Sequence, residues 1–83
     1  MVSEDAALLK RIMSDPKVLC GKPIVRGTRI PVSLILNFVA NGMCTEEIRQ
    51  EYPQLEDADI RAAIVFAEKI TDGEGVFDEA AAG

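Results

Sequence analysis

The sequence predicts a mainly α-helical fold, a three-helix domain of the helix-turn-helix type with a short N-terminal β hairpin or strand. Three observations support this prediction. Apolar residues between positions 31 and 70 recur at helical spacing in three segments. Two stop signals, Asn41-Gly42 and Tyr52-Pro53, separate those segments. Upstream, β-branched residues on both sides of a Gly-Thr pair favour extended structure around a tight turn.

The composition fits one small domain, which we place at residues 1–70, followed by an acidic tail over residues 71–83. An apolar fraction of 48% excludes a disordered chain. We expect a cytoplasmic protein, because neither a membrane span nor a secretory signal is visible. The chain has no histidine, and Cys20 and Cys44 are expected to be free thiols. We therefore expect no enzymatic activity, cofactor or metal.

The N-terminal segment 3–13 looks helical at its start, because Ser3 can cap a helix and two acids follow it. Residues 11–14 could equally form a short strand. Asp15-Pro16 ends either element, since the residue before proline disfavours helix.

Residues 22–32 combine rigidity and charge, with the sequence Lys-Pro-Ile-Val-Arg-Gly-Thr-Arg-Ile-Pro-Val. Glycine is favoured as the first central residue of a type II′ turn, and we place Gly27 there. This predicts a hairpin of residues 24–26 against 29–30, with Arg26 and Arg29 at its tip.

The first helix of the trio is expected from Pro31 to Asn41, with Gly42 as its left-handed cap. Its apolar residues cover nearly the whole circumference, so it should be buried on more than one side. Because so short a chain cannot bury all of that surface, we expect a homodimer.

The second helix is expected to have Thr45 as its cap and to end at Pro53. The third should begin near Glu56 or Asp57 and run to about Ile70. It carries two apolar stripes, one made of Ile60, Ala63, Ile64, Ala67 and Ile70 and the other of Ala62, Val65 and Phe66. We interpret Phe38 and Phe66 as core residues.

Charge is divided unevenly along the chain. Residues 10–29 hold six of the nine basic residues and one acid, whereas residues 30–83 hold three bases and eleven acids. Such asymmetry is typical of a chain with charged partners. The candidate DNA-binding residues are Arg11, Lys22, Arg26, Thr28 and Arg29. Two alternatives stay open: the arginines of the tip could pair with acids such as Glu46 or Glu47, and Thr28 could serve only the turn.

The run from Arg11 to about Phe66 closely resembles the domain-of-unknown-function family numbered 433. The resemblance rests on Asp15-Pro16, Gly21-Lys22-Pro23, Arg26 to Val32, Gly42, Tyr52-Pro53 and Asp59 to Ala63. It implies a homeodomain-like fold with a short N-terminal β element. Many members look like antitoxins encoded beside PIN-like nuclease toxins, which implies neutralisation of such a toxin and binding to operator DNA.

Two positions depart from the family pattern. Cys20 stands where a second glycine is usual, and Glu56 stands where the third helix usually has a threonine cap. Glu56, Asp57 and Asp59 therefore lie at the start of the expected recognition helix, where they would repel DNA. We expect any DNA contact to run through the basic end instead.

In the tail, Val76 and Phe77 are apolar among acids, which is typical of a segment that anchors to a partner. The sequence thus predicts an antitoxin-like partner of a PIN-type ribonuclease that can also bind operator DNA. The alternative functions are a stand-alone transcriptional regulator and an assembly module without a toxin.

Overall fold

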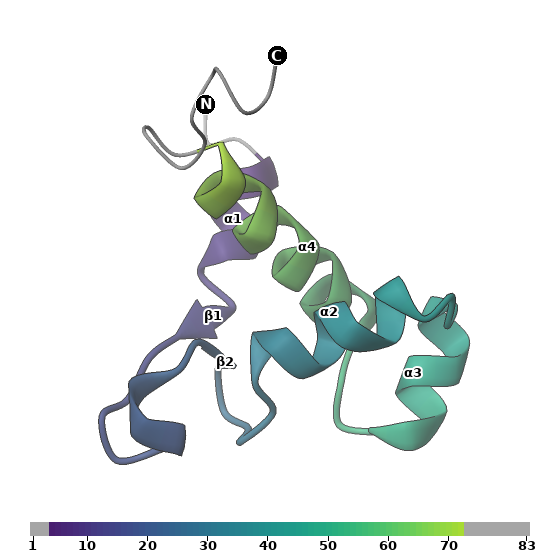
Figure 1. Ribbon diagram of the computed structural model, residues 1–83, viewed down its shortest axis with the longest axis horizontal. Coiled ribbons are helices and arrows are strands. Elements are labelled where there is room, and N and C mark those ends of the chain that lie inside the picture. Colours follow the sequence, from purple (N-terminus) through teal and green to yellow (C-terminus); the bar gives the residue numbers. More distant parts are fainter. Residues whose placement is uncertain (1–3, 73–83) are drawn as a thin grey trace, which may run out of the picture.

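The computed structural model describes residues 4–72, which form four α-helices, a 3-10 turn and two short strands (Figure 1). In chain order these are α1 (Glu4–Leu9), β1 (Ile12–Met13), η1 (Leu19–Gly21), β2 (Ile24–Val25), α2 (Val32–Ala40), α3 (Thr45–Glu51) and α4 (Asp57–Thr71). The mainly helical class with an N-terminal β element is confirmed. The N-terminal segment forms both of the elements considered for it, a helix and then a strand.

The two strands form a small antiparallel sheet in which Ile12 lies opposite Val25 and Met13 lies opposite Ile24. The predicted hairpin is therefore only a minor part of the pairing. Residues that follow the turn return beside β2 through two backbone hydrogen bonds, Val25 N to Ile30 O at 3.0 Å and Val32 N to Pro23 O at 2.9 Å, which flank a bridge between Ile24 and Pro31. The ladder joins β2 to β1, and β1 in turn packs against α4.

The turn after β2 is one residue out of the predicted register. Thr28 N donates to Val25 O at 3.0 Å, so Gly27, with φ of 82°, is the second central residue of the turn. A type II turn requires positive φ at that position, so the type II′ prediction is wrong. The Thr28 hydroxyl donates to Val25 O at 2.8 Å and accepts from Ile30 N at 3.0 Å. Thr28 therefore serves the turn.

The 3-10 turn η1 contains an unusual run of left-handed backbone. Leu19, Cys20 and Gly21 have φ of 50°, 56° and 81°, and only the last of them is glycine. The Leu19 side chain is exposed, and so is the free thiol of Cys20. L-residues with a side chain are strained in this conformation, so η1 is a locally costly segment.

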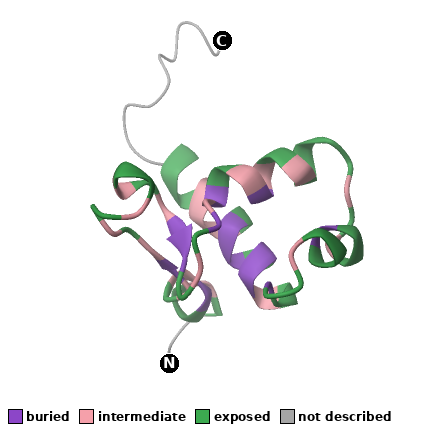
Figure 2. Cartoon of the chain, turned by 90° about the horizontal axis from the view of Figure 1, so that it is seen from below, coloured by how far each residue is buried: buried purple, intermediate pink, exposed green. Residues whose placement is uncertain are grey.

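Helix α4 is the centre of the fold, since α1, α2, α3 and β1 all pack against it. Figure 2 shows the buried residues on the strands and on the inner helices. The core consists of Leu8, Ile12, Ile24, Val25, Ile30, Val32, Ile35, Ile48, Leu55, Ile60, Ala62 and Ala63. Phe38 and Phe66 are half-buried against this core, and the Phe38 ring lies 5.9 Å from the Tyr52 ring.

The ends of the helices follow the predicted stop signals within a residue or two. Gly42, with φ of 84°, follows α2 as the expected left-handed cap. Helix α3 is capped by Cys44 and not by Thr45. The Glu47 carboxylate accepts from Cys44 N at 2.9 Å, and this hydrogen bond lowers the pKa of Glu47. A carboxylate three residues inside the helix thus replaces the cap expected from the threonine.

The predicted apolar stripes of α4 are only partly buried. Ile60, Ala62 and Ala63 are buried, but Ile64 and Ile70 are 44% and 54% exposed. Helix α2 also exposes more apolar surface than a fully enclosed helix would, because Val39 and Ala40 are open to solvent. The described chain therefore has uncovered apolar surface on both of these helices.

Candidate functional site: a basic end, an acidic face and an apolar groove

Arg11 is held by the acids at the start of α4. Its Nη1 lies 2.9 Å from Glu56 Oε1 and 3.0 Å from Asp59 Oδ1. The hydrogen bond to Glu56, and then the one to Asp59, raise the pKa of Arg11 above its ordinary value. The predicted DNA-binding role of Arg11 is not supported by this geometry, since its cation already faces two carboxylates.

Asp59 is the buried member of that cluster, with 6% of its surface exposed. Its Oδ2 accepts from Glu56 N at 2.8 Å, so Asp59 satisfies the first free amide of α4 while its other oxygen binds Arg11. Burial of the carboxylate is tolerated because both oxygens are paired. An acid three residues after the cap is the available sequence signal for this role, although Asp59 was considered from sequence only as a charge that would repel DNA.

Arg26 fastens the turn after β2 to the connection between α1 and β1. Its Nε donates to the backbone oxygen of Lys10 at 2.8 Å, and its own N–H donates to Arg11 O at 2.7 Å. Within residues 4–72 neither Arg26 nor Arg29 pairs with Glu46 or Glu47, so the ion pairs considered from sequence do not form there.

Three of the five candidate DNA-binding residues line one cleft of about 430 Å³. Arg11, Arg26 and Thr28 meet there with Lys10, Gly27, Gln54, Glu56 and Asp59. Arg29 and Lys22 lie outside it, and their side chains have no hydrogen bond or ion pair among the described residues. The cations of the basic end that have no acidic partner among the described residues are therefore Lys10, Lys17, Lys22, Arg26 and Arg29.

An acidic face covers α3 and the first turn of α4. Glu46, Glu47, Glu51, Glu56 and Asp57 are all exposed there. The one basic residue of this stretch is Arg49, whose Nε donates to Leu55 O at 3.1 Å and holds the connection between the two helices. The five residues define the acidic face, and their negative potential disfavours nucleic acid at this surface.

Helix α1 packs against α4, and its acidic residues form ion pairs with basic residues of α4. Arg61 forms an ion pair with Glu4, and Lys69 Nζ lies 3.4 Å from Asp5 Oδ2. This contact was missed by sequence reasoning, because it joins residues more than fifty positions apart. As a result, both of these cations on α4 already have an acidic partner within the chain.

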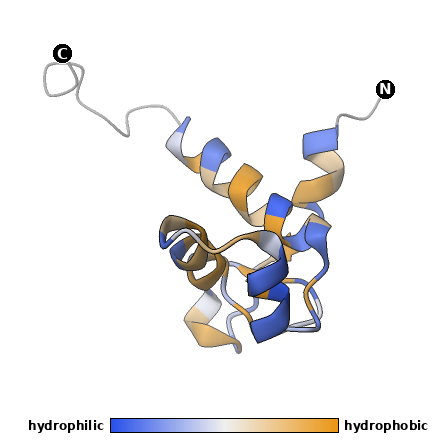
Figure 3. Cartoon of the chain, turned by 90° about the vertical axis from the view of Figure 1, so that its right-hand side faces the viewer, coloured by the Kyte–Doolittle hydropathy of each residue, from blue (hydrophilic) through white to orange (hydrophobic). Residues whose placement is uncertain are grey.

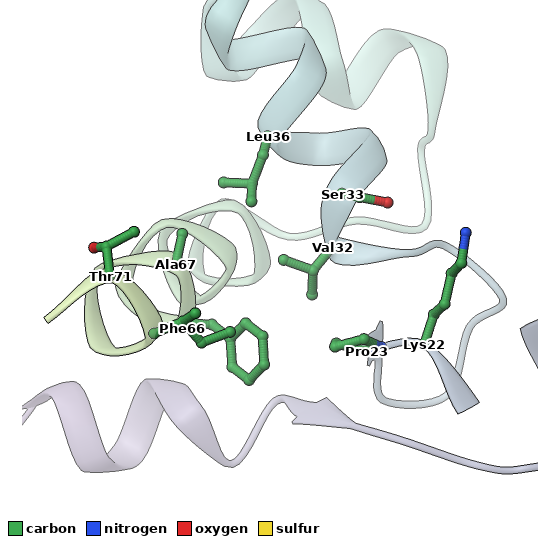
Figure 4. A pocket seen from close by; sticks show the side chains of 9 residues that line it. Lys22, Pro23, Val32, Ser33, Leu36, Phe66, Ala67 and Thr71 are labelled. Atoms are coloured by element: carbon green, nitrogen blue, oxygen red, sulfur yellow. The ribbon is translucent and has the colours of Figure 1, made fainter. Parts of the chain in front are cut away.

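An apolar groove of about 310 Å³ lies between α2 and α4 (Figure 4). Its walls are Pro23, Val32, Leu36, Phe66, Ala67 and Ile70, and Lys22, Ser33 and Thr71 complete the lining. Helix α2 carries no charged residue along its nine positions and is coloured as hydrophobic over most of its length in Figure 3. We call this surface the α2–α4 groove, and its composition is typical of a surface that another protein covers.

The remaining candidate residues, Val76 and Phe77, lie outside the described residues. No group of three metal-ligating side chains occurs within residues 4–72. None of the helices in that range is long and apolar enough to cross a membrane.

The fold and its surfaces define a small, mainly helical domain with a two-stranded sheet at its N-terminal side. The model of the family described as "Protein of unknown function (DUF433)" matches residues 12–67. The chain belongs to this family.

Two similar proteins were found, one of which is itself described as a member of this family. A DUF433 member protein from Anabaena variabilis ATCC 29413, solved by crystallography, superposes with a TM-score of 0.70 at 30% identity, over 80% of this chain and 65% of that one. The "Uncharacterized protein y4eO" of Sinorhizobium fredii (strain NBRC 101917 / NGR234) is 40% identical over 63 residues, or 76% of this chain. The match spans only 28% of that longer relative.

Proposed function

We propose that the protein is an antitoxin-like partner that neutralises a PIN-type ribonuclease in the cytoplasm, without a cofactor or catalysis of its own. In this proposal α2, α3 and α4 correspond to the three helices of a homeodomain-like domain, and α3 and α4 to its helix-turn-helix pair. The partner class comes from the family resemblance, in which many members look like antitoxins encoded beside such nucleases.

The acidic face is the observation that carries the proposal. Five exposed carboxylates lie on α3 and the start of α4, and the nearby Arg49 is engaged with Leu55 O. A ribonuclease needs a basic surface to hold RNA, so an acidic protein surface complements the same groove and can exclude the substrate. The same charges oppose DNA at the position where a helix-turn-helix protein places its recognition helix.

Operator DNA is a second candidate ligand, supported by the cations of the basic end. Arg29 and Lys22 are exposed, and no acid of residues 4–72 neutralises them. These two residues belong to the basic segment 10–29, whereas the acidic face belongs to the acidic segment 30–83. A DNA complex would therefore use the loops around the sheet, and the acidic face would stay free for the ribonuclease. A stand-alone regulator would use the same loops without a toxin.

The experiment is inhibition of the PIN-type ribonuclease encoded beside the gene, with purified full-length chain. Glu46→Lys combined with Glu51→Lys should weaken inhibition by about tenfold or more, because charged pairs at an interface couple by a kcal/mol or more. Glu68→Lys is the matched control, since Glu68 is exposed on the far end of α4 and its change of charge is the same per site. Equal inhibition by all variants, or no neighbouring nuclease, would refute the proposal.

A further inference from the structure

We infer that the α2–α4 groove is the contact through which two copies of this chain form a two-fold symmetric dimer, with Ile70 of each copy inserted into the groove of the other. The inference does not depend on the ribonuclease partner. It concerns a surface away from the acidic face and leaves that face open.

The first argument is the lack of charge on the groove. The nine residues of α2 contain no ionisable side chain, and the groove walls are aliphatic or aromatic. The centres of protein interfaces are depleted of charged residues in the same way. Ile70 is the most exposed of the large apolar side chains in the described chain, and it stands on the wall of this groove. The exposed Ile70 side chain of one molecule can therefore fill the apolar groove of a second molecule.

The second argument identifies the occupant as another copy. The chain has a net charge of −5, so two copies repel each other wherever their acidic faces meet. The groove is a surface where identical chains can meet without placing like charges together. A two-fold axis brings the same patch of both copies together, which requires the patch to be complementary to itself.

The rims of the groove meet that requirement. Lys22 lines one side and Thr71, in the last turn of α4, lines the other (Figure 4). Asp72 follows Thr71 as the C-cap, and the C-terminal end of a helix carries partial negative charge. The Lys22 side chain has no acidic partner within residues 4–72. A two-fold axis that crosses the groove at right angles to the line from Lys22 to Thr71 places Lys22 of one copy against the end of α4 in the other, and we infer this orientation.

The test is the mass of the full-length chain in solution across the micromolar range, by light scattering. The wild-type protein should have twice the mass of the 9.0 kDa chain. Ile70→Asp should shift it to a monomer with an unchanged helical circular dichroism spectrum, because Ile70 is 54% exposed and supports little of the core. Ile64→Asp is the matched control on the same helix, 44% exposed and outside the groove, and it should remain dimeric.

Two further measurements keep the inference testable if Ile70→Asp does not fold. Ser33→Arg places a charge on the groove lining from α2 and should also give a monomer. Lys22→Glu and Asp72→Lys should each weaken the homodimer, and a mixture of the two variants should form a heterodimer, detected by native mass spectrometry.

A monomeric wild-type protein would overturn the inference, and so would a dimer that Ile70→Asp and Ser33→Arg leave intact. If the groove instead holds residues 73–83 of the same chain or the ribonuclease, the dimer will survive these substitutions or will not form. Failure of the dimer test leaves ribonuclease inhibition by the acidic face unaffected, so the two proposals fail separately.

Discussion

Replacement of Cys20 by glycine should stabilise the protein. Cys20 has φ of 56° and ψ of 34°, and its side chain is exposed. Its backbone N–H donates no hydrogen bond to another backbone group of this loop. A residue with a Cβ costs about 1–2 kcal/mol in this left-handed region. Glycine removes that strain, but it makes the unfolded chain more flexible, at a cost of about 0.4–1 kcal/mol. The middle values of these two ranges give an expected net gain of about 0.5–1 kcal/mol.

For a domain of this size that gain corresponds to a rise in the melting temperature of about 2–8 °C. The measurement is urea and thermal unfolding followed by circular dichroism, at fixed protein concentration and with a reducing agent. Cys20→Ala is the control, because it removes the thiol and keeps the Cβ, and its stability should stay within about 0.5 kcal/mol of the wild type. The strain argument is refuted if Cys20→Gly is no more stable than Cys20→Ala.

Three further predictions concern the hydrogen bonds of helix ends and turns. Asp59→Ala should lower the free energy of unfolding by about 1–3 kcal/mol in urea titrations, because it removes one of the two carboxylate partners of Arg11 and leaves the Glu56 N–H at the start of α4 without its acceptor; an unchanged midpoint would contradict this. The pKa of Glu47 is lowered by the Cys44 N–H, so its contribution to stability is complete above the ordinary glutamate pKa and is lost as the pH falls through the folded value. Glu47→Gln should therefore reduce the acid-induced loss of stability, and identical pH profiles for variant and wild type would count against the capping interaction. Gly27→Ala should cost about 1 kcal/mol through strain alone, because a Cβ there meets no atom within 4 Å, and a neutral result would mean that the turn can change type.

The local elements of this fold could be predicted because their signals are local. Gly42 ends α2 and Pro53 follows α3, and both act through the backbone of their immediate neighbours. The predicted cap of α3 and the predicted turn after β2 were each wrong by one residue. In both places a neighbouring side chain makes a hydrogen bond that favours a different local geometry. Glu47 reaches back to cap α3, so Cys44 and not Thr45 occupies the cap, and the Thr28 hydroxyl helps to fix the turn with Gly27 in its second central position.

The functional surfaces could be predicted much less well, because they depend on long-range contacts. Arg11 lies next to basic residues in the sequence, yet the fold places it beside Glu56 and Asp59, 45 and 48 positions away. Counting charges along residues 10–29 correctly identified a basic segment. The count could not show that Arg11 is already paired with two carboxylates and so adds little positive charge to the surface. In the same way, the short helix α1 was visible from sequence, whereas its ion pairs with α4 depend on how the chain closes on itself.

The closure of α1 on α4 also bears on how this domain can be used within larger proteins. The ion pair between Asp5 and Lys69 brings the two ends of the described chain to one side of the molecule, as Figure 1 shows. A polypeptide could enter and leave the domain on the same side, which is the geometry that favours insertion into another protein. The acidic face and the basic loops would stay exposed in such an insertion, so a host protein would gain both charged surfaces together.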